Sequence, residues 1–185
     1  LEFTIKVTYK RNSNDTSDVF ISSLGVSGQS YLAIRDTSTG VQYLSAAGLP
    51  LNRTFTNVPL DYLVHTYVFV TSSGLVKLFV DGKFSEEFAM TIPPRQPGTF
   101  GNFHYGYNIL YNNNNGANSN SDVTLYDSSF INKAVDDYTA IGLSSKGDYT
   151  ESDLGLLNSD YLYKHVFDYN PNYAATIDDL SPNNH

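Results

Sequence analysis

The sequence predicts an all-β protein of the sandwich class on three observations. Apolar and polar residues alternate with a period of two in several runs, and turn signals recur at about the 8–12-residue spacing that is typical of sandwiches. No helical apolar stripe precedes residue 132. The chain has 185 residues, of which 41% are apolar, so one domain can bury a substantial core.

The segment from Val64 to Phe84 predicts a β-hairpin around which the rest of the chain is organised. Its first run is apolar at most positions, which predicts a strand that is covered on both faces. A turn is expected at Ser72-Ser73-Gly74, and Asp81-Gly82 ends the second run with a dipeptide suited to a primed turn. In that second run the alternation predicts one buried face made of Val76, Leu78 and Val80.

Short strands are expected on both sides of this hairpin, bounded by Gly, Pro and Asn-rich turns. They cover Phe3–Tyr9, Val19–Gly25, Tyr31–Asp36, Val41–Ser45, Arg53–Asn57, Phe84–Ile92, Phe100–Tyr107 and Val123–Ile131. In the third of them, inward-facing Leu32 and Ile34 would leave Tyr31 and Arg35 outside. After these strands, Ala134–Leu143 predicts one short helical turn, since Val135, Tyr138 and Ile141 are spaced to lie near one face.

The predicted sandwich covers residues 1–143, and residues 144–185 form an acidic, Tyr-rich C-terminal extension. We expect the extension to pack on the sandwich or to lead to a further domain. Its one apolar run, YLYKHVFDY, fits an edge strand, a short packed helix or the start of a linker. The chain opens directly in a strand-like run without a signal peptide, which favours a domain cut from a longer polypeptide.

Charge and composition restrict the partners. The net charge of −8 would repel a phosphate backbone, which argues against nucleic acid, and no apolar run is long enough to insert into a membrane. The absence of Cys excludes disulfides and thiolate metal sites. With 15 Tyr, 11 Phe and few Lys, the composition suits a secreted or particle-borne adhesive domain, so we expect an extracellular, cell-surface or virion location.

No catalytic constellation is evident. The candidate carboxylate pairs are Glu151 with Asp153, in the extension, and the adjacent Glu86 and Glu87, whose side chains would point to opposite faces of a strand. No serine lies in a G-x-S-x-G elbow. The histidines lack metal-ligand spacing. We therefore do not expect an enzyme.

The Asn-rich tract from Asn112 to Asp122 has two interpretations. Its alternating Asn, Gly and Asp residues fit oxygen ligands around calcium, although the tract offers one carboxylate where calcium prefers several. The alternative is a long polar hairpin tip, because Asn and Gly tolerate positive φ. Such a loop on a rigid sandwich also fits a recognition surface. No other cofactor is expected.

The aromatic surplus is the most informative chemical signal. Sugars present apolar C–H faces and dense hydroxyls, so their sites combine flat rings with side chains that hydrogen-bond in fixed directions, and FGNFHYGYNILYN supplies both kinds. Arginine adds bidentate pairing with an acidic sugar. The alternatives are core packing for the aromatic residues and plain surface for the arginines. The candidate ligand-binding residues are Tyr31, Arg35, Arg95, His104, Tyr105, Tyr107, Asn108, Tyr111 and Asn112.

The hairpin HTYVFVTSSGLVKLFVDGKF resembles a segment shared by the concanavalin A-like lectin superfamily, in particular laminin-G-like modules and the lectin domains that accompany sialidases. His65, Val70-Thr71, Gly74, Leu78-Phe79-Val80 and Asp81-Gly82 carry the match. The resemblance implies a jelly-roll sandwich of two antiparallel sheets that binds ligands on a concave sheet or its rim loops. The chain differs from sialic-acid-binding members at Gln42 and Leu44, where those members tend to carry Glu and Arg.

These observations favour a non-catalytic carbohydrate-binding module that mediates adhesion to glycans on a cell surface or cell wall, as part of a larger surface, secreted or phage tail protein. Affinity would be gained mainly through many copies in one assembly. The alternative is a protein–protein adhesion or structural module of the same fold, because a fold does not settle its function.

Overall fold

A computed structural model describes residues 2–12, 19–26, 29–46, 50–90, 102–104, 123–147, 149–168 and 176–179 of the chain. These residues form two antiparallel β-sheets and one α-helix, so the predicted all-β class is confirmed. The chain divides into two compact units. The first contains residues 1–10, 63–89 and 124–185, and the second contains residues 11–62 and 90–123.

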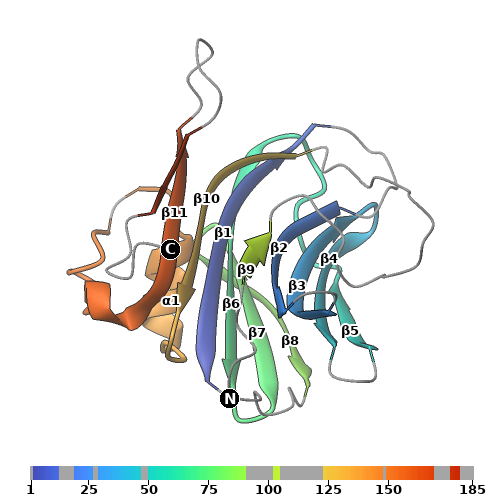
Figure 1. Ribbon diagram of the computed structural model, residues 1–185, viewed down its shortest axis with the longest axis horizontal. Coiled ribbons are helices and arrows are strands. Elements are labelled where there is room, and N and C mark those ends of the chain that lie inside the picture. The colour runs from blue at the N-terminus through green and yellow to red at the C-terminus, as the bar shows by residue number, and fades with distance from the viewer. Residues whose placement is uncertain are drawn as a thin grey trace. The chain divides into compact units, whose positions relative to one another are not determined.

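The first unit is built on a seven-stranded sheet with the order β12-β11-β10-β1-β6-β7-β8 (Figure 1). Its strands are β1 (Phe3–Arg11), β6 (Val64–Ser72), β7 (Leu75–Val80), β8 (Lys83–Ala89), β10 (Val123–Ile131), β11 (Tyr161–Asp168) and β12 (Thr176–Asp179). The predicted central hairpin is therefore the β6–β7 pair, and β6 lies between β1 and β7.

The first predicted strand forms β1, and its apolar face is buried as the sequence indicates, although Thr4 and Thr8 on the opposite face are buried as well. In β1 the side chains of Phe3, Ile5, Val7 and Tyr9 are almost completely buried. Two of them stack on aromatic rings of neighbouring strands, with ring centroids 4.8 Å apart for Tyr9 and Tyr67 and 5.0 Å apart for Phe3 and Phe130. These stacked pairs add to the apolar burial that holds β1 between β6 and β10.

Two tight turns shape the β6–β7–β8 region, and both were predicted. Ser73 and Gly74 have φ values of 50° and 79°, and Asp81 and Gly82 have values of 47° and 79°. Two consecutive positive φ values are the signature of the type I′ turn, whose twist matches that of a hairpin. The second turn is also held from outside, because the Asp81 carboxylate accepts a hydrogen bond from the Thr66 amide at 3.0 Å.

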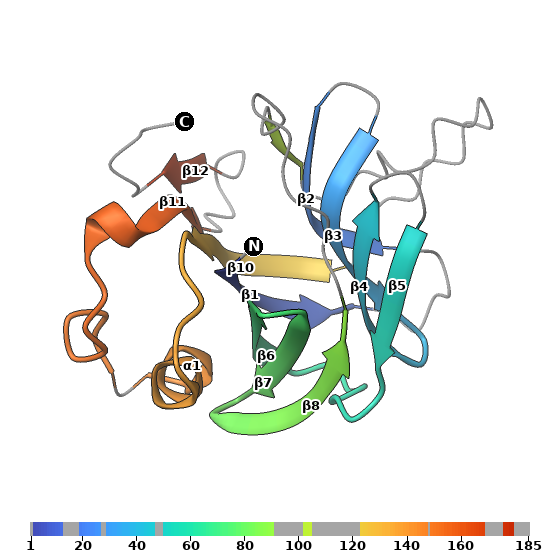
Figure 2. The same cartoon turned by 90° about the horizontal axis from the view of Figure 1, so that it is seen from below.

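Helix α1 (Asp137–Ser144) covers part of one face of this sheet, beside the β6–β7 hairpin (Figure 2). Asp136 caps the helix by accepting a hydrogen bond from the Thr139 amide at 2.7 Å, which lowers the pKa of the Asp136 carboxyl. The predicted buried face of the helix is wrong. Tyr138 and Ile141 are exposed, whereas the helix buries its small residues, such as Ala140 and Gly142.

Part of the C-terminal extension joins the same core. Leu154, Leu156 and Tyr161 pack in one cluster with residues of α1, β6 and β7. The apolar run YLYKHVFDY, for which strand, helix and linker were all open, forms strand β11 between β10 and β12. A short 3-10 turn, Asn158–Asp160, precedes it, and there the Asp160 carboxylate accepts from the Leu157 amide at 2.9 Å.

The second unit is built on a five-stranded sheet with the order β5-β4-β3-β2-β9. Its strands are β2 (Val19–Val26), β3 (Gln29–Thr37), β4 (Gly40–Ala46), β5 (Pro50–Phe55) and β9 (Asn102–His104). Three of the predicted strands in this sheet agree with these bounds to within two residues, whereas the strand predicted at Arg53–Asn57 runs from Pro50 to Phe55. Of the strand predicted at Phe100–Tyr107, the described residues 102–104 form β9. In the part of the chain that the structure describes, no helix has the length and hydropathy needed to span a bilayer.

Candidate functional site

The five-stranded sheet has two chemically different faces. On one face, Ile34, Val41, Tyr43 and Phe55 are each 0% exposed and form an apolar surface, with Asp36 and Arg53 beside it on the same face. Side chains alternate between faces along a strand, so the neighbouring residues of β3, β4 and β5 belong to the other face. That other face is polar wherever the structure describes its side chains.

The polar face is centred on one cross-strand row. Backbone register pairs Arg35 of β3 with Gln42 of β4, and Gln42 in turn with Thr54 of β5. All three side chains are half-buried, and Asn52, two residues before Thr54 and hence on the same face, is exposed. We call these four residues, Arg35, Gln42, Asn52 and Thr54, the polar row. A guanidinium, two amides and a hydroxyl thus lie side by side on a rigid sheet.

Gln42 has hydrogen-bonding capacity to spare. Its Nε2 donates to Thr54 Oγ1 at 3.1 Å, while its Oε1 is buried and has no donor among the described residues. A buried acceptor without a donor costs free energy, so a ligand that supplies a donor here would be stabilised.

A buried ion pair holds the strand that carries Arg35. Arg11 donates from Nη2 to Oδ1 of Asp36 and to the carbonyl oxygen of Thr37 at 2.7 Å, and Arg11 and Asp36 are both buried. Asp36 directly follows Arg35 in β3. The pair fixes the end of β3 and with it the position of the Arg35 backbone on the polar face.

Two other predicted site residues lie on the same sheet, where the structure describes their backbones only. Tyr31 lies in β3 at a register shift, because Leu24 pairs with Leu32 while the next residue, Gly25, pairs with Ser30. His104 lies in the edge strand β9 and pairs with Ser23, which in turn pairs with Ala33, two residues before Arg35. Backbone register thus places His104 and Arg35 at equivalent pleat positions with β2 between their strands.

The remaining predicted site residues, Arg95, Tyr105, Tyr107, Asn108, Tyr111 and Asn112, lie outside the described residues. The Asn-rich tract considered for calcium lies there too. In the described part of the chain, no three His, Asp or Glu side chains gather in a way that would hold a metal ion. Calcium binding by the tract remains a prediction.

Glu151 and Asp153, one of the two pairs considered for catalysis, both have partners in the fold. Glu151 forms an ion pair with Lys164 at 2.5 Å. Asp153 accepts from the hydroxyl of Thr150 at 2.5 Å and from its amide at 2.9 Å, and these hydrogen bonds lower the pKa of the Asp153 carboxyl. A carboxyl with a lowered pKa is a poor general acid.

Sequence reasoning did not select three members of the polar row, namely Gln42, Asn52 and Thr54. A signal for Gln42 was present, because it stands between the apolar residues Val41 and Tyr43 in a predicted strand. Alternation alone predicts that the Gln42 side chain lies on the opposite face of the strand from those of Val41 and Tyr43. Its pairing with Arg35 required the register of two strands, which the sequence does not state.

No protein-family model matches this chain, and no curated protein sequence matches it. Solved structures do match. The CBM40 domain of the Ruminococcus gnavus IT-sialidase has a TM-score of 0.57 at 13% identity over 78% of this chain and 83% of that one. The same domain bound to α2,3-sialyllactose has a TM-score of 0.56 at 14% identity, over 78% and 82% of the two chains.

Part of a larger protein also matches. The leech intramolecular trans-sialidase gives a TM-score of 0.56 at 16% identity, and the match covers 80% of this chain but 24% of that one. A Trypanosoma rangeli sialidase gives 0.53 at 16% identity over 77% of this chain and 22% of the other. At such low identity these likenesses establish architecture and no more. The chain has the β-sandwich fold of sialidase CBM40 carbohydrate-binding modules.

Proposed function

We propose that this chain is a non-catalytic carbohydrate-binding module that binds glycans on the polar face of its five-stranded sheet. The observation that carries the proposal is the polar row itself. Arg35, Gln42 and Thr54 stand in one cross-strand row, and the Gln42 amide retains a buried polar atom with no partner among the described residues. Sugar hydroxyls both donate and accept, so they can satisfy such an atom.

Each group has a role in this proposal. The Arg35 guanidinium donates to adjacent sugar oxygens or to the carboxylate of an acidic sugar. Gln42 and Asn52 fix hydroxyl groups, and the rigid strands hold the three side chains at fixed spacing. Tyr31 and His104 belong to the same sheet and extend the site along it. We also assign Arg95, Tyr105, Tyr107, Asn108, Tyr111 and Asn112 to the ligand-binding surface.

The fold supports this function without proving it. The CBM40 domain with the matching architecture was solved with α2,3- and α2,6-sialyllactose. We propose that this chain likewise acts outside the cell, at a cell surface or on a virion, and that several copies in a larger assembly supply avidity for a shallow site. Neither the sugar nor the assembly follows from the fold alone.

The test is binding of the multimerised full chain to an array of neutral and sialylated glycans. We expect a defined subset of glycans to bind, and Arg35→Ala to weaken binding by about tenfold or more, since it removes a charge-assisted hydrogen bond. Arg53→Ala is the matched control, because Arg53 is an exposed arginine of the same sheet whose Nη1 donates to the Asn52 carbonyl at 3.0 Å, on the face opposite Arg35.

Two results would contradict the proposal. One is the absence of binding to any glycan on the array together with tight binding to a host protein, which would favour the protein–protein adhesion module. The other is glycan binding that Arg35→Ala leaves unchanged. Release of monosaccharide from any glycan on the array would show that the chain is an enzyme.

A further inference from the structure

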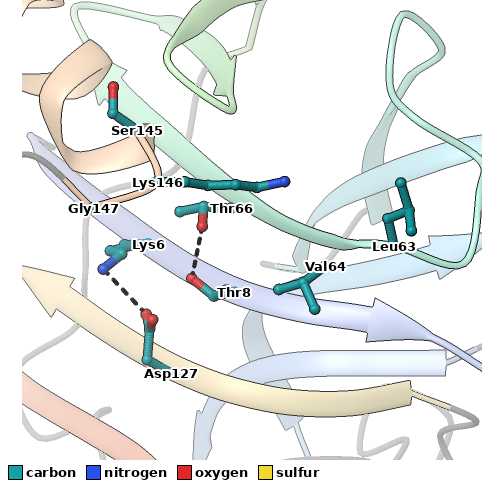
Figure 3. Close-up of a pocket in the computed structure, with 9 residues that line it drawn as sticks. All are labelled: Lys6, Thr8, Leu63, Val64, Thr66, Asp127, Ser145, Lys146 and Gly147. Atoms are coloured by element: carbon teal, nitrogen blue, oxygen red, sulfur yellow. Dashed lines mark hydrogen bonds and ion pairs between the residues drawn. The ribbon is translucent and has the colours of Figure 1, made fainter.

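A pocket of about 520 Å³ lies on the seven-stranded sheet, on the face opposite the buried side chains of Phe3, Ile5, Val7 and Tyr9, and shares no residue with the polar row (Figure 3). Strands β1, β6 and β10 form its floor, and the loop that follows α1 forms one side. Its volume falls within the range of small-ligand sites. The lining residues are Lys6, Thr8, Leu63, Val64, Thr66, Asp127, Ser145, Lys146 and Gly147.

A charged donor and a charged acceptor stand next to each other in this pocket. Lys6 Nζ lies 3.4 Å from Asp127 Oδ1, and both side chains are about three-quarters covered, at 26% and 27% exposure. Figure 3 shows the ammonium pointing toward the carboxylate. One such contact uses one of three ammonium hydrogens and one of several carboxylate lone pairs, so both groups retain capacity for a ligand.

Two hydroxyl groups lie on the pocket floor beside this pair. Thr8 Oγ1 and Thr66 Oγ1 are 3.0 Å apart and buried, and their register pairs them directly across β1 and β6. A hydrogen bond between two hydroxyls uses one hydrogen and one lone pair, so one hydrogen and three lone pairs are left. Among the described residues neither hydroxyl has another partner.

The charges around the pocket cancel. Lys6 faces Asp127, and Lys146 lies 3.5 Å from Asp81, which also contacts His65 Nδ1 at 2.5 Å. Each of the two ammonium groups thus has a carboxylate within 3.5 Å, so neither an anion nor a cation is strongly selected by charge. The wall at Leu63 and Val64 is apolar, and Leu63 is 64% exposed.

We propose that this pocket is a second ligand site, for a neutral sugar residue. Neighbouring hydroxyls of a sugar each donate and accept, so one can donate to Asp127 while the next accepts from Lys6. The threonine hydroxyls take a third oxygen, and the apolar wall takes a C–H face of the ring. The site shares no residue with the polar row and does not depend on glycan binding there.

The test is a titration of the full chain with methyl β-galactoside and methyl α-mannoside, followed through the backbone amide NMR signals of Thr8, Thr66, Lys146 and Gly147. Gluconate, a polyol of similar size that carries a carboxylate, is the anionic probe. We expect at least one neutral glycoside to shift these signals saturably with a millimolar Kd. Asp127→Asn should weaken binding by about tenfold, since it removes the charged acceptor.

Asp137→Asn is the matched control, because it breaks another Lys–Asp pair of the same unit, between Lys77 of β7 and Asp137 of α1, outside the pocket. Arg35→Ala separates the two sites: retained pocket shifts in this variant support the inference whether or not the polar row binds glycans. The inference is overturned if neither glycoside moves the pocket signals, if gluconate alone does, or if the response survives Asp127→Asn. It is also overturned if the response disappears in Arg35→Ala.

Discussion

Replacing Arg11 by Met tests whether the buried ion pair holds the strand that carries the polar row. Arg11 is 4% exposed and Asp36 is 7% exposed, and the guanidinium also donates to the Thr37 carbonyl at 2.7 Å. Methionine keeps much of the side-chain length but supplies neither hydrogen bond. The variant therefore leaves the Asp36 carboxylate buried beside an apolar side chain.

The expected cost is large because the change removes one partner of a buried ion pair. Removing one partner of a buried ion pair costs about 3–5 kcal/mol. For a chain of this size, 1 kcal/mol corresponds to about 2–4 °C in Tm, so Arg11→Met should lower Tm by about 6–20 °C. The comparison variant is Lys6→Met. It removes a partly exposed partner of Asp127, and such pairs contribute about 0–1 kcal/mol.

Differential scanning calorimetry at neutral pH measures both variants, and the double variant Arg11→Met/Asp36→Leu completes the series. Because the double variant removes both charges, it should recover most of the loss. Arg11→Met should also weaken glycan binding, since Asp36 adjoins Arg35 in β3. The reasoning fails if Arg11→Met melts within about 2 °C of the parent chain, or if the double variant is no more stable than Arg11→Met.

Two further predictions concern the first unit. In chemical denaturation, Gly82→Ala should be more destabilising than Gly74→Ala. Both glycines have a φ of 79°, so alanine at either position carries a backbone strain of about 1–2 kcal/mol. An added Cβ meets Ser145 Oγ at 2.7 Å at Gly82, whereas nothing lies within 4 Å of it at Gly74. Equal losses would show that the serine side chain moves aside at no cost. The second prediction concerns pH, because the backbone N–H of Leu157 is the largest of the causes that lower the pKa of Asp160 from its ordinary 3.8. This contribution to stability is present above the unfolded pKa and is lost as the pH falls through the folded pKa. The difference in unfolding free energy between the parent chain and Asp160→Asn should therefore be constant near neutral pH and close below about pH 4. A difference that persisted at lower pH would contradict the prediction.

Local rules were sufficient for the turns of the central hairpin, but not for all of its burial, because Phe79, on the face opposite Val76, Leu78 and Val80, is 1% exposed. Asp81-Gly82 and Ser73-Gly74 adopt consecutive positive φ values because these residues tolerate that region and the twist of the hairpin requires it. The alternation in β1 predicted its buried face because one side of that strand is apolar throughout. Such inferences need only neighbouring residues, so a single sequence supports them.

Helix α1 shows where local rules fail. The spacing of Val135, Tyr138 and Ile141 predicts an apolar face, yet Tyr138 is 65% exposed. The helix approaches its neighbours through small residues instead: a Cβ on Gly142 would lie 2.4 Å from Leu154 Cδ2. Contact with a leucine twelve residues later in the chain selected this face, and helical periodicity carries no information about that contact.

Part of the aromatic surplus, which the composition suggests is a sugar-binding surface, builds the cores of the two sheets. Tyr9, Tyr43, Tyr67 and Tyr163 are among the largest fully buried side chains of the described residues, so much of the surplus builds the two sheets rather than a sugar-stacking surface. Buried tyrosines do not distinguish a glycan binder from any other sandwich. Polar groups held on a rigid sheet with unused hydrogen-bonding capacity do, because they bind a ligand only if it supplies matching donors and acceptors. For this reason the Gln42 amide is a stronger argument for glycan recognition than the number of aromatic residues. Composition alone gives no reason to select this residue. Gln42→Leu should weaken glycan binding while leaving the apolar face of the sheet intact.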